Sequence, residues 1–191
     1  TCYTRLRRIY SRGTNYQRIE DLNNLSRYIC EHRPPVEEIN RRLKEIYRKK
    51  TYPEWAIVFL GFAGVSFFFT LFFGGNLQDA LVAFVCGALT RVVFRAMEYV
   101  HTNGFFINLV CSFLITFITL LAVQYHLAPH SNSIIIGTLM TLVPGVAITN
   151  SMRDVIAGDL VAGMMKAMEA LLVALALAMG TGMALIVLGG I

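Results

Sequence analysis

Residues 104–123, "GFFINLVCSFLITFITLLAV", contain no charged side chain. About 20 helical residues cross the roughly 30 Å hydrocarbon core of a bilayer, so this stretch is long and apolar enough to span one. Residues 56–73, "AIVFLGFAGVSFFFTLFF", and residues 170–191 are also free of charge. The chain has 191 residues, is 55% hydrophobic and has a mean hydropathy of +0.56. Such runs exceed what a soluble core requires, so the sequence predicts an all-α, polytopic membrane protein.

Basic side chains are concentrated ahead of the apolar runs. Most of the 17 lysine and arginine residues lie within residues 1–50, and a basic segment before the first span usually stays in the cytoplasm. Such a segment can also contact anionic lipid headgroups, whereas no aromatic and basic pattern here favours nucleic acid as a partner. The dispersed cysteines indicate no disulfide framework, metal site or cofactor; they are Cys2, Cys30, Cys86 and Cys111.

Residues 1–52 are predicted to form a basic cytosolic region that contains a helical hairpin. The first helix covers residues 15–30, and the prolines of "HRPP" (32–35) end it, because proline removes a donor and disfavours helix before it. A second helix then runs to about Lys50. Since the chain begins at Thr1 in the middle of a pattern, we expect this region to be truncated at its N-terminus. Apolar residues at helical spacing define one face of each helix: Tyr16, Ile19, Leu22, Leu25 and Ile29, then Val36, Ile39, Leu43, Ile46 and Tyr47.

Residues 53–191 are predicted to form a transmembrane domain of five helices. The loops at 74–79 and 126–133 contain no lysine or arginine, whereas Arg91, Arg95 and Arg153 fall on the same side as the basic N-terminal region. Because cytoplasmic loops carry the excess of basic residues, the N-terminus is expected in the cytoplasm and the C-terminus outside. The expected spans are about 54–73, 80–97, 104–125, 134–157 and 160–190.

Residues 140–159, "MTLVPGVAITNSMRDVIAGD", bring a helix breaker and polar groups into the expected fourth span. Eleven residues separate Ser133, at the outer surface, from Pro144, which corresponds to about 16 Å and a position near the bilayer midplane. Pro144 lacks a backbone donor and Gly145 tolerates unusual dihedral angles, so the fourth helix is predicted to be discontinuous. A plain proline kink, with its freed groups satisfied by neighbouring helices, is the alternative.

A break at this depth would expose the N-terminus of the second half-helix to water or a bound solute. Unpaired amides and a partial positive charge at that end suit a carboxylate. The predicted substrate-binding residues are therefore Pro144, Gly145, Thr149, Asn150 and Arg153. Asn108 is added because it forms a polar stripe with Ser112 and Thr116 on the third span, which either holds helices together or lines a path.

Three acidic residues near the fifth span are candidates for proton coupling, because ionisable groups inside a membrane are costly and usually functional. Asp154 and Asp159 are expected at the inner surface, where a role as an Arg153 partner or as a cap of the fifth helix is the alternative. Glu169 lies about 14 Å deep if that helix enters at Leu160. If the helix enters later, Glu169 is interfacial and pairs with Lys166.

At "LVPGVAITNSMRDVIAGDLVAGMMKAMEAL" (142–171) the sequence resembles the threonine/serine exporter family, and within it the YjjP-like large half of the two-component members. The Pro-Gly, Thr-Asn, Arg-Asp, Gly-Asp and Glu-Ala pairs recur in this order, and the likeness covers most of the chain. The resemblance implies an exporter of threonine and serine, or of succinate, in a bacterial inner membrane, driven by the membrane potential or a proton gradient. It marks these matching positions: Pro144, Gly145, Thr149, Asn150, Arg153, Asp154, Asp159 and Glu169.

The sequence therefore predicts a component of a secondary-active exporter of small carboxylate-bearing metabolites, and not an enzyme. The sequence contains no G-x-x-x-x-G-K-[ST] motif, so it gives no sign of an ATP-binding site that would drive transport. An intramembrane aspartyl protease would need a second aspartate, in a Tyr-Asp pair on another span, besides the Gly-Asp at 158–159, and this second aspartate is missing. A structural membrane scaffold without its own transport site is the alternative. Five spans without a second copy of the motif predict a partner, either a smaller multi-span membrane protein or further copies of the chain.

Overall fold

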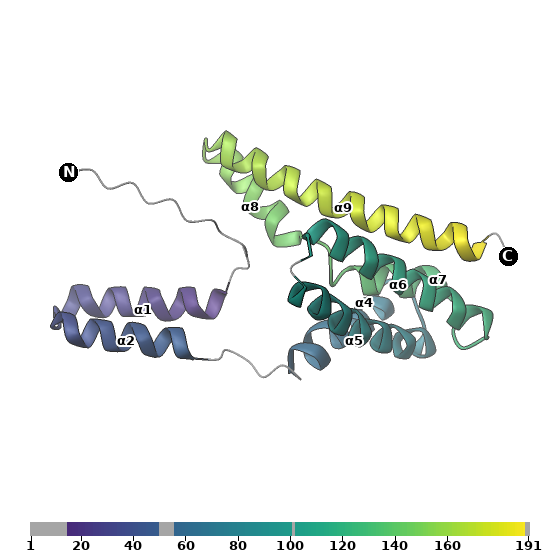
Figure 1. The fold of residues 1–191 in the computed structure, drawn as a ribbon, viewed down its shortest axis with the longest axis horizontal. Coiled ribbons are helices and arrows are strands. Elements are labelled where there is room, and N and C mark those ends of the chain that lie inside the picture. Colours follow the sequence, from purple (N-terminus) through teal and green to yellow (C-terminus); the bar gives the residue numbers. More distant parts are fainter. Residues whose placement is uncertain (1–14, 50–55, 101, 190–191) are drawn as a thin grey trace. The chain divides into compact units, whose positions relative to one another are not determined.

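The computed structural model describes residues 15–49, 56–100 and 102–189, and every element in these ranges is a helix (Figure 1). The chain divides into two compact units, Thr1–Pro53 and Glu54–Ile191. Several helices of the second unit are strongly apolar, so the structure supports an all-helical membrane protein.

The first unit contains a hairpin of two helices, α1 (Tyr16–His32) and α2 (Val36–Arg48). Asn15 caps α1, because its side-chain oxygen accepts a hydrogen bond from the Arg18 amide at 3.0 Å. Arg33 ends α1 in a left-handed conformation with φ of 45°, and the two prolines that follow prevent continuation. The predicted pair of helices and the stop between them are thus confirmed.

A polar cluster around Glu38 connects the two helices of the hairpin. The guanidinium of Arg42 donates to Glu38 Oε1 from Nε at 3.0 Å and from its terminal nitrogen at 2.8 Å. The Tyr28 hydroxyl of α1 donates to the same oxygen at 3.3 Å, and the guanidinium lies 4.1 Å from the centre of the Tyr28 ring. These hydrogen bonds from Arg42 lower the pKa of the Glu38 carboxyl.

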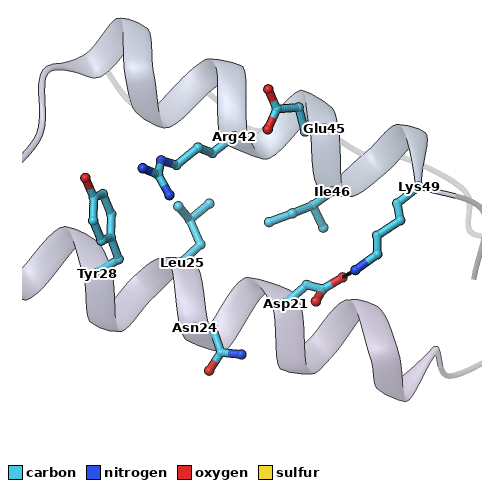
Figure 2. A pocket seen from close by; sticks show the side chains of 8 residues that line it. All are labelled: Asp21, Asn24, Leu25, Tyr28, Arg42, Glu45, Ile46 and Lys49. Atoms are coloured by element: carbon cyan, nitrogen blue, oxygen red, sulfur yellow. Dashed lines mark hydrogen bonds and ion pairs between the residues drawn. The ribbon is translucent and has the colours of Figure 1, made fainter.

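Figure 2 shows the open groove between α1 and α2, which has a volume of about 530 Å³. At one end of this groove Lys49 Nζ lies 3.2 Å from the carboxylate of Asp21. Leu25 is buried at 8% exposure, and it lines the groove together with Ile46. The groove is lined by Asp21, Asn24, Leu25, Tyr28, Arg42, Glu45, Ile46 and Lys49.

The second unit begins with a π-helix, η1 (Ile57–Ala63), that continues into α4 (Gly64–Phe72). Two long helices follow, α5 (Leu77–Tyr99) and α6 (Gly104–Gln124). The unit ends with α7 (Ser131–Leu139), α8 (Gly145–Ile156) and α9 (Leu160–Gly189). In Figure 1, α9 runs alongside α6 and α8.

Three helices in the described part are long and apolar enough to cross a membrane. They are Leu77–Tyr99, Gly104–Gln124 and Leu160–Leu188, and they coincide with the second, third and fifth predicted spans. Leu60–Phe72 is a shorter apolar helix, and the fourth predicted span is divided between α7 and α8. The structure therefore supports several spans, while the count of five stays a prediction.

The turn before α5 is shorter than the predicted loop at 74–79, because Leu77 already begins the helix. Asn76 accepts a hydrogen bond from the Asp79 amide at 2.9 Å, and Asp79 accepts one from the Asn76 amide at 2.8 Å. This reciprocal capping box satisfies two amides at the helix start and draws Asp79 into the first turn.

Glycines set the closest helix contacts in the second unit. A Cβ on Gly137 of α7 would lie 2.6 Å from the Thr70 amide nitrogen of α4. A Cβ on Gly180 of α9 would meet the carbonyl of Leu109 and the hydroxyl of Ser112 on α6. These positions let the backbones approach closely, as small residues do in membrane helices.

Candidate functional site

Two separate short helices, α7 and α8, lie where the sequence predicts a broken fourth span. After Leu139 the chain makes a tight turn, in which the Leu142 amide donates to the Leu139 carbonyl at 2.9 Å. Pro144 then precedes α8 with φ of −82° and ψ of 56°, outside the helical region, and the Gly145 amide donates back to Val143 at 2.9 Å. Five residues, 140–144, therefore separate two helices that would otherwise form one rod.

The interruption is anchored by one apolar side chain. Leu142 is buried at 7% exposure and packs in a cluster with Ile107, Cys111 and Ile115 of α6 and Leu177 of α9. The turn is thus held against two long helices that qualify as spans. Pro144 is half-buried and Gly145 is exposed, so the start of α8 faces away from this cluster.

The start of α8 has no side-chain cap, so its first amides depend on backbone, water or a ligand. Thr149 is exposed, and its hydroxyl donates to the Gly145 carbonyl at 3.0 Å within the same helix. Asn150 is half-buried and Arg153 is exposed. Four predicted binding residues therefore share one short helix with an uncapped N-terminus: Gly145, Thr149, Asn150 and Arg153.

Asn108 is not joined to α8 by any hydrogen bond in the described region. Its amide donates to the Gly104 carbonyl of its own helix at 2.8 Å. Further along the predicted stripe, the Ser112 hydroxyl donates to the Leu109 carbonyl at 3.0 Å and approaches the Ala176 carbonyl of α9 at 3.5 Å. The Thr116 hydroxyl is fully buried and has no partner among the described residues.

Of the three acidic candidates, Asp154 has the clearest partner. Lys166 of α9 places its Nζ 2.5 Å from Asp154 Oδ2 of α8, and both side chains are partly exposed. Asp159 lies in the turn between the helices, where its amide donates to the Asp154 carbonyl at 2.9 Å. Glu169 is exposed on α9, ten residues after Asp159. The structure thus brings Asp159 to the Asp154 backbone, and the Asp154 side chain pairs with Lys166 of α9.

Two features of the second unit were not identified from the sequence. Asp79 is fully buried; it accepts a hydrogen bond from the backbone amide of His130 and contacts the ring of His130, whose side chain is 55% exposed. An open cavity of about 420 Å³ lies between α5 and α6 in the same part of the unit. The signal for Asp79 was its position three residues after Asn76, but the pairing with His130 spans 51 residues and has no local pattern. The cavity is lined by Gln78, Leu81, Val82, Val85, Cys86, Ile118, Ala122 and Leu127.

A comparison with protein families matches residues 1–188 to the model of the family ThrE, described as "Putative threonine/serine exporter". The chain belongs to this threonine/serine exporter family. The family is one of membrane transporters, so the transport and membrane predictions from the sequence are confirmed at this level, and the family description is not that of an enzyme.

Two curated relatives show how this exporter family member compares in length. A protein of Mycobacterium tuberculosis named "Probable threonine/serine exporter" is 23% identical over 179 residues, which are 93% of this chain and 33% of the relative. "Pheromone-regulated membrane protein 10" of Debaryomyces hansenii is 24% identical over 176 residues, 89% of this chain and 17% of the relative. The chain thus spans about a third or less of these relatives. No solved structure matches the chain.

Proposed function

We propose that the protein is a component of a secondary-active exporter of small carboxylate-bearing metabolites, either threonine and serine or a dicarboxylate of the succinate type. The family match carries this proposal, and the separation of α7 from α8 before Gly145 supports a solute site there. Broken helices at the midplane are the common binding device of secondary transporters.

In this proposal the second unit crosses the membrane five times, and α7 with α8 forms a discontinuous fourth crossing. The π-helix and α4 together make the first crossing, since η1 runs directly into α4. The distribution of basic residues places the N-terminus in the cytoplasm and the C-terminus outside. The membrane is proposed to be a bacterial inner membrane.

The solute would bind at the start of α8. A carboxylate there would accept hydrogen bonds from the uncapped amides and benefit from the positive end of the helix dipole. Thr149 and Asn150 would contact the remaining polar groups of the solute, while Arg153, one turn further, would attract its negative charge. Asn108 of α6 is also proposed to contact the solute, because it forms a polar stripe with Ser112 and Thr116.

Proton coupling is assigned to the acidic group at the end of α8 and the start of α9. Asp154, Asp159 and Glu169 are its members. Lys166 forms an ion pair with Asp154. A proton that binds Asp154 would break this ion pair, because the protonated carboxyl carries no charge to attract the ammonium group. This arrangement links the charge on Asp154 to the contact between α8 and α9.

The transporter would be completed by a second component. Because five crossings without a second copy of the 142–171 motif do not make up the two repeats common in secondary transporters, a smaller multi-span membrane protein or further copies of this chain would supply the remaining crossings. The lipid bilayer contacts the exposed apolar side chains of α9, which include Leu172, Leu175 and Ile186.

Efflux from proteoliposomes tests this function. Vesicles that contain the protein with its co-purifying component are loaded with labelled threonine, serine or succinate, and release is followed under an imposed proton gradient. Pro144→Ala should slow release about tenfold or more, because it allows α7 and α8 to join and removes the free amides. Glu169→Gln should slow gradient-driven release, whereas Gly182→Ala, where an added Cβ meets nothing within 4 Å, should not. Wild-type rates in both Pro144→Ala and Glu169→Gln would overturn the proposed mechanism.

A further inference from the structure

Asp79 makes an unusual set of contacts for a residue in the first turn of an apolar helix. Its side chain has no exposed surface, although a buried carboxylate is costly unless it is well hydrogen-bonded. Oδ1 accepts from the His130 amide at 3.1 Å, and Oδ2 accepts from the Asn76 amide at 2.8 Å. The His130 ring nitrogen Nδ1 also lies 2.8 Å from Oδ2. Both oxygens are therefore used, and His130 is held twice.

His130 is the residue that leads directly into α7. It is the N-cap of this helix, and its carbonyl accepts the first helical hydrogen bond from Ile134 at 3.3 Å. No side-chain cap of its own stabilises the start of α7. By holding both the amide and the ring of His130, Asp79 fixes the position at which α7 begins.

Two further contacts place α7 against the same neighbours. The Ser133 hydroxyl donates to the Phe73 carbonyl, at the end of α4, at 3.1 Å. Gly137 allows close approach to Thr70 of α4. A helix of nine residues is too short to be stable alone, so its position depends on such contacts. The Asp79–His130 contact is the one that involves a charged group.

We infer that Asp79 and His130 are positioning residues that fix α7, the first half of the interrupted helix, against α4 and α5 and so set the place of the interruption at residues 140–144. The role in transport rests on the proposed function, whereas the control of α7 does not. Neither residue touches the proposed solute site. Both act through α7, whose last residue is Leu139.

Hydrogen exchange of the full chain in lipid nanodiscs tests the control of α7. Asp79→Asn and His130→Ala should raise the exchange of the 131–139 amides by about tenfold, the change expected when a hydrogen bond to a charged group is lost. His130→Asn should restore most of the protection, because the asparagine amide can place a donor where Nδ1 lies. Exchange in α6 and α9 should not change.

Two controls separate this role from general damage. Asn76→Ala removes the side-chain cap of α5 but keeps the Asp79–His130 contact, so it should loosen the start of α5 and leave α7 protected. His126→Asn changes another histidine in the same loop that is not a partner of the Asp79 carboxylate, and should behave as wild type. If Asp79→Asn does not fold, His130→Ala still gives the answer, because it leaves the carboxylate with its backbone donors.

Export measured on the same variants then tests the consequence for transport. We expect His130→Ala to slow release about tenfold and His130→Asn to recover it. Unchanged exchange of α7 in both Asp79→Asn and His130→Ala would overturn the inference. A loosened α7 with wild-type export would confirm that the two residues hold α7 and would overturn their role in transport. If the wild-type protein itself exports no solute, the proposed function is wrong, while the exchange of α7 still decides whether Asp79 and His130 hold this helix.

Discussion

Asp154 is proposed to have both a structural role, through its ion pair with Lys166, and a functional role in proton coupling. Their ion pair joins α8 to α9 and is partly exposed, so it stabilises this contact by less than about 1 kcal/mol. Because the ion pair is this weak, a proton can bind Asp154 and displace Lys166 at little cost in free energy. The sequence identified Asp154 as a candidate, with a role as an Arg153 partner as the alternative. It did not identify Lys166 as the partner, because neighbours along the chain are visible in a sequence and a partner 12 residues away is not.

A charge exchange separates the two roles of Asp154. Asp154→Lys and Lys166→Asp should each loosen α8 from α9, and the double variant should restore the contact because the charges are again opposite. If Asp154 also carries a proton, the double variant should still export slowly. Hydrogen exchange of α8 measures the contact, and proteoliposome efflux measures export. Full recovery of export in the double variant would contradict a coupling role for Asp154.

Glu38 allows a prediction about pH in the hairpin. Hydrogen bonds from Arg42 lower the pKa of the Glu38 carboxyl from its ordinary value of 4.5. Because the folded pKa is the lower one, this contact stabilises the hairpin above pH 4.5 and is lost as the pH falls through the folded value.

The measurement for Glu38 is a carbon-13 titration of its carboxyl in the full chain. Arg42→Gln should raise the titration midpoint toward 4.5, and Lys44→Gln, which removes a charge that does not act on Glu38, should leave it unchanged. An identical midpoint in wild type and Arg42→Gln would show that the guanidinium does not control this carboxyl.

At the scale of elements, the sequence predicted the positions of the long helices, but it did not predict the start of every helix correctly. The apolar runs predicted α6 and α9 to within a residue or two, because length and hydropathy are local properties. The start of α5 was placed too late, since Asn76 and Asp79 form a capping box that looks like a polar turn. The π-helix at Ile57–Ala63 gave no signal, because its hydrogen-bond register is not encoded in hydropathy.

The contact between α6 and α9 depends on Gly180. Ala170, Ala174, Ala178 and Gly182 also lie at helical spacing on α9, but in the described unit Ala174 and Ala178 are exposed and an added Cβ on Gly182 meets nothing within 4 Å. Only Ala170 of this set is buried. Small residues at helical spacing show that close packing is possible on a face but do not identify which of two adjacent faces is used.

Two adjacent glycine substitutions test this contact. Gly180→Ala should destabilise the protein by about 1–3 kcal/mol, because the new methyl group would overlap the Leu109 carbonyl and force α6 and α9 apart. Gly182→Ala should be neutral, since the same methyl group meets open space. Thermal unfolding in detergent compares them, and equal melting temperatures for the two variants would contradict the described packing.

At the scale of the whole molecule, the sequence predicted the class of protein and the region of the site better than the contacts within it. The membrane class and the exporter family followed from composition and from the motif at 142–171. The start of a helix at Gly145 could be expected because proline acts through its own backbone, while a broken membrane crossing there stays a prediction. Asp79 and His130 were not, because they meet only after α4, α5 and α7 have packed.

The assembly state is a prediction at this same scale. Five predicted spans without a second copy of the 142–171 motif favour a partner protein or further copies of the chain. We expect native mass spectrometry of the protein, extracted with its lipids, to show a complex with a second membrane protein or several copies of the chain. A particle of 21.4 kDa that exports solute by itself would contradict the proposed need for a partner.

The most direct test of the account is water access to the start of α8. In a variant without its four cysteines, single cysteines are placed at Ala147, Ile136 and Ile156 and treated with a small charged thiol reagent in membranes. The account predicts that Ala147→Cys is labelled, that threonine, serine or succinate slows this labelling, and that Ile136→Cys, on the exposed apolar side of α7, is not labelled. Labelling at Ile156→Cys without any at Ala147→Cys would show that the interruption is closed to water and solute, and would contradict the central claim.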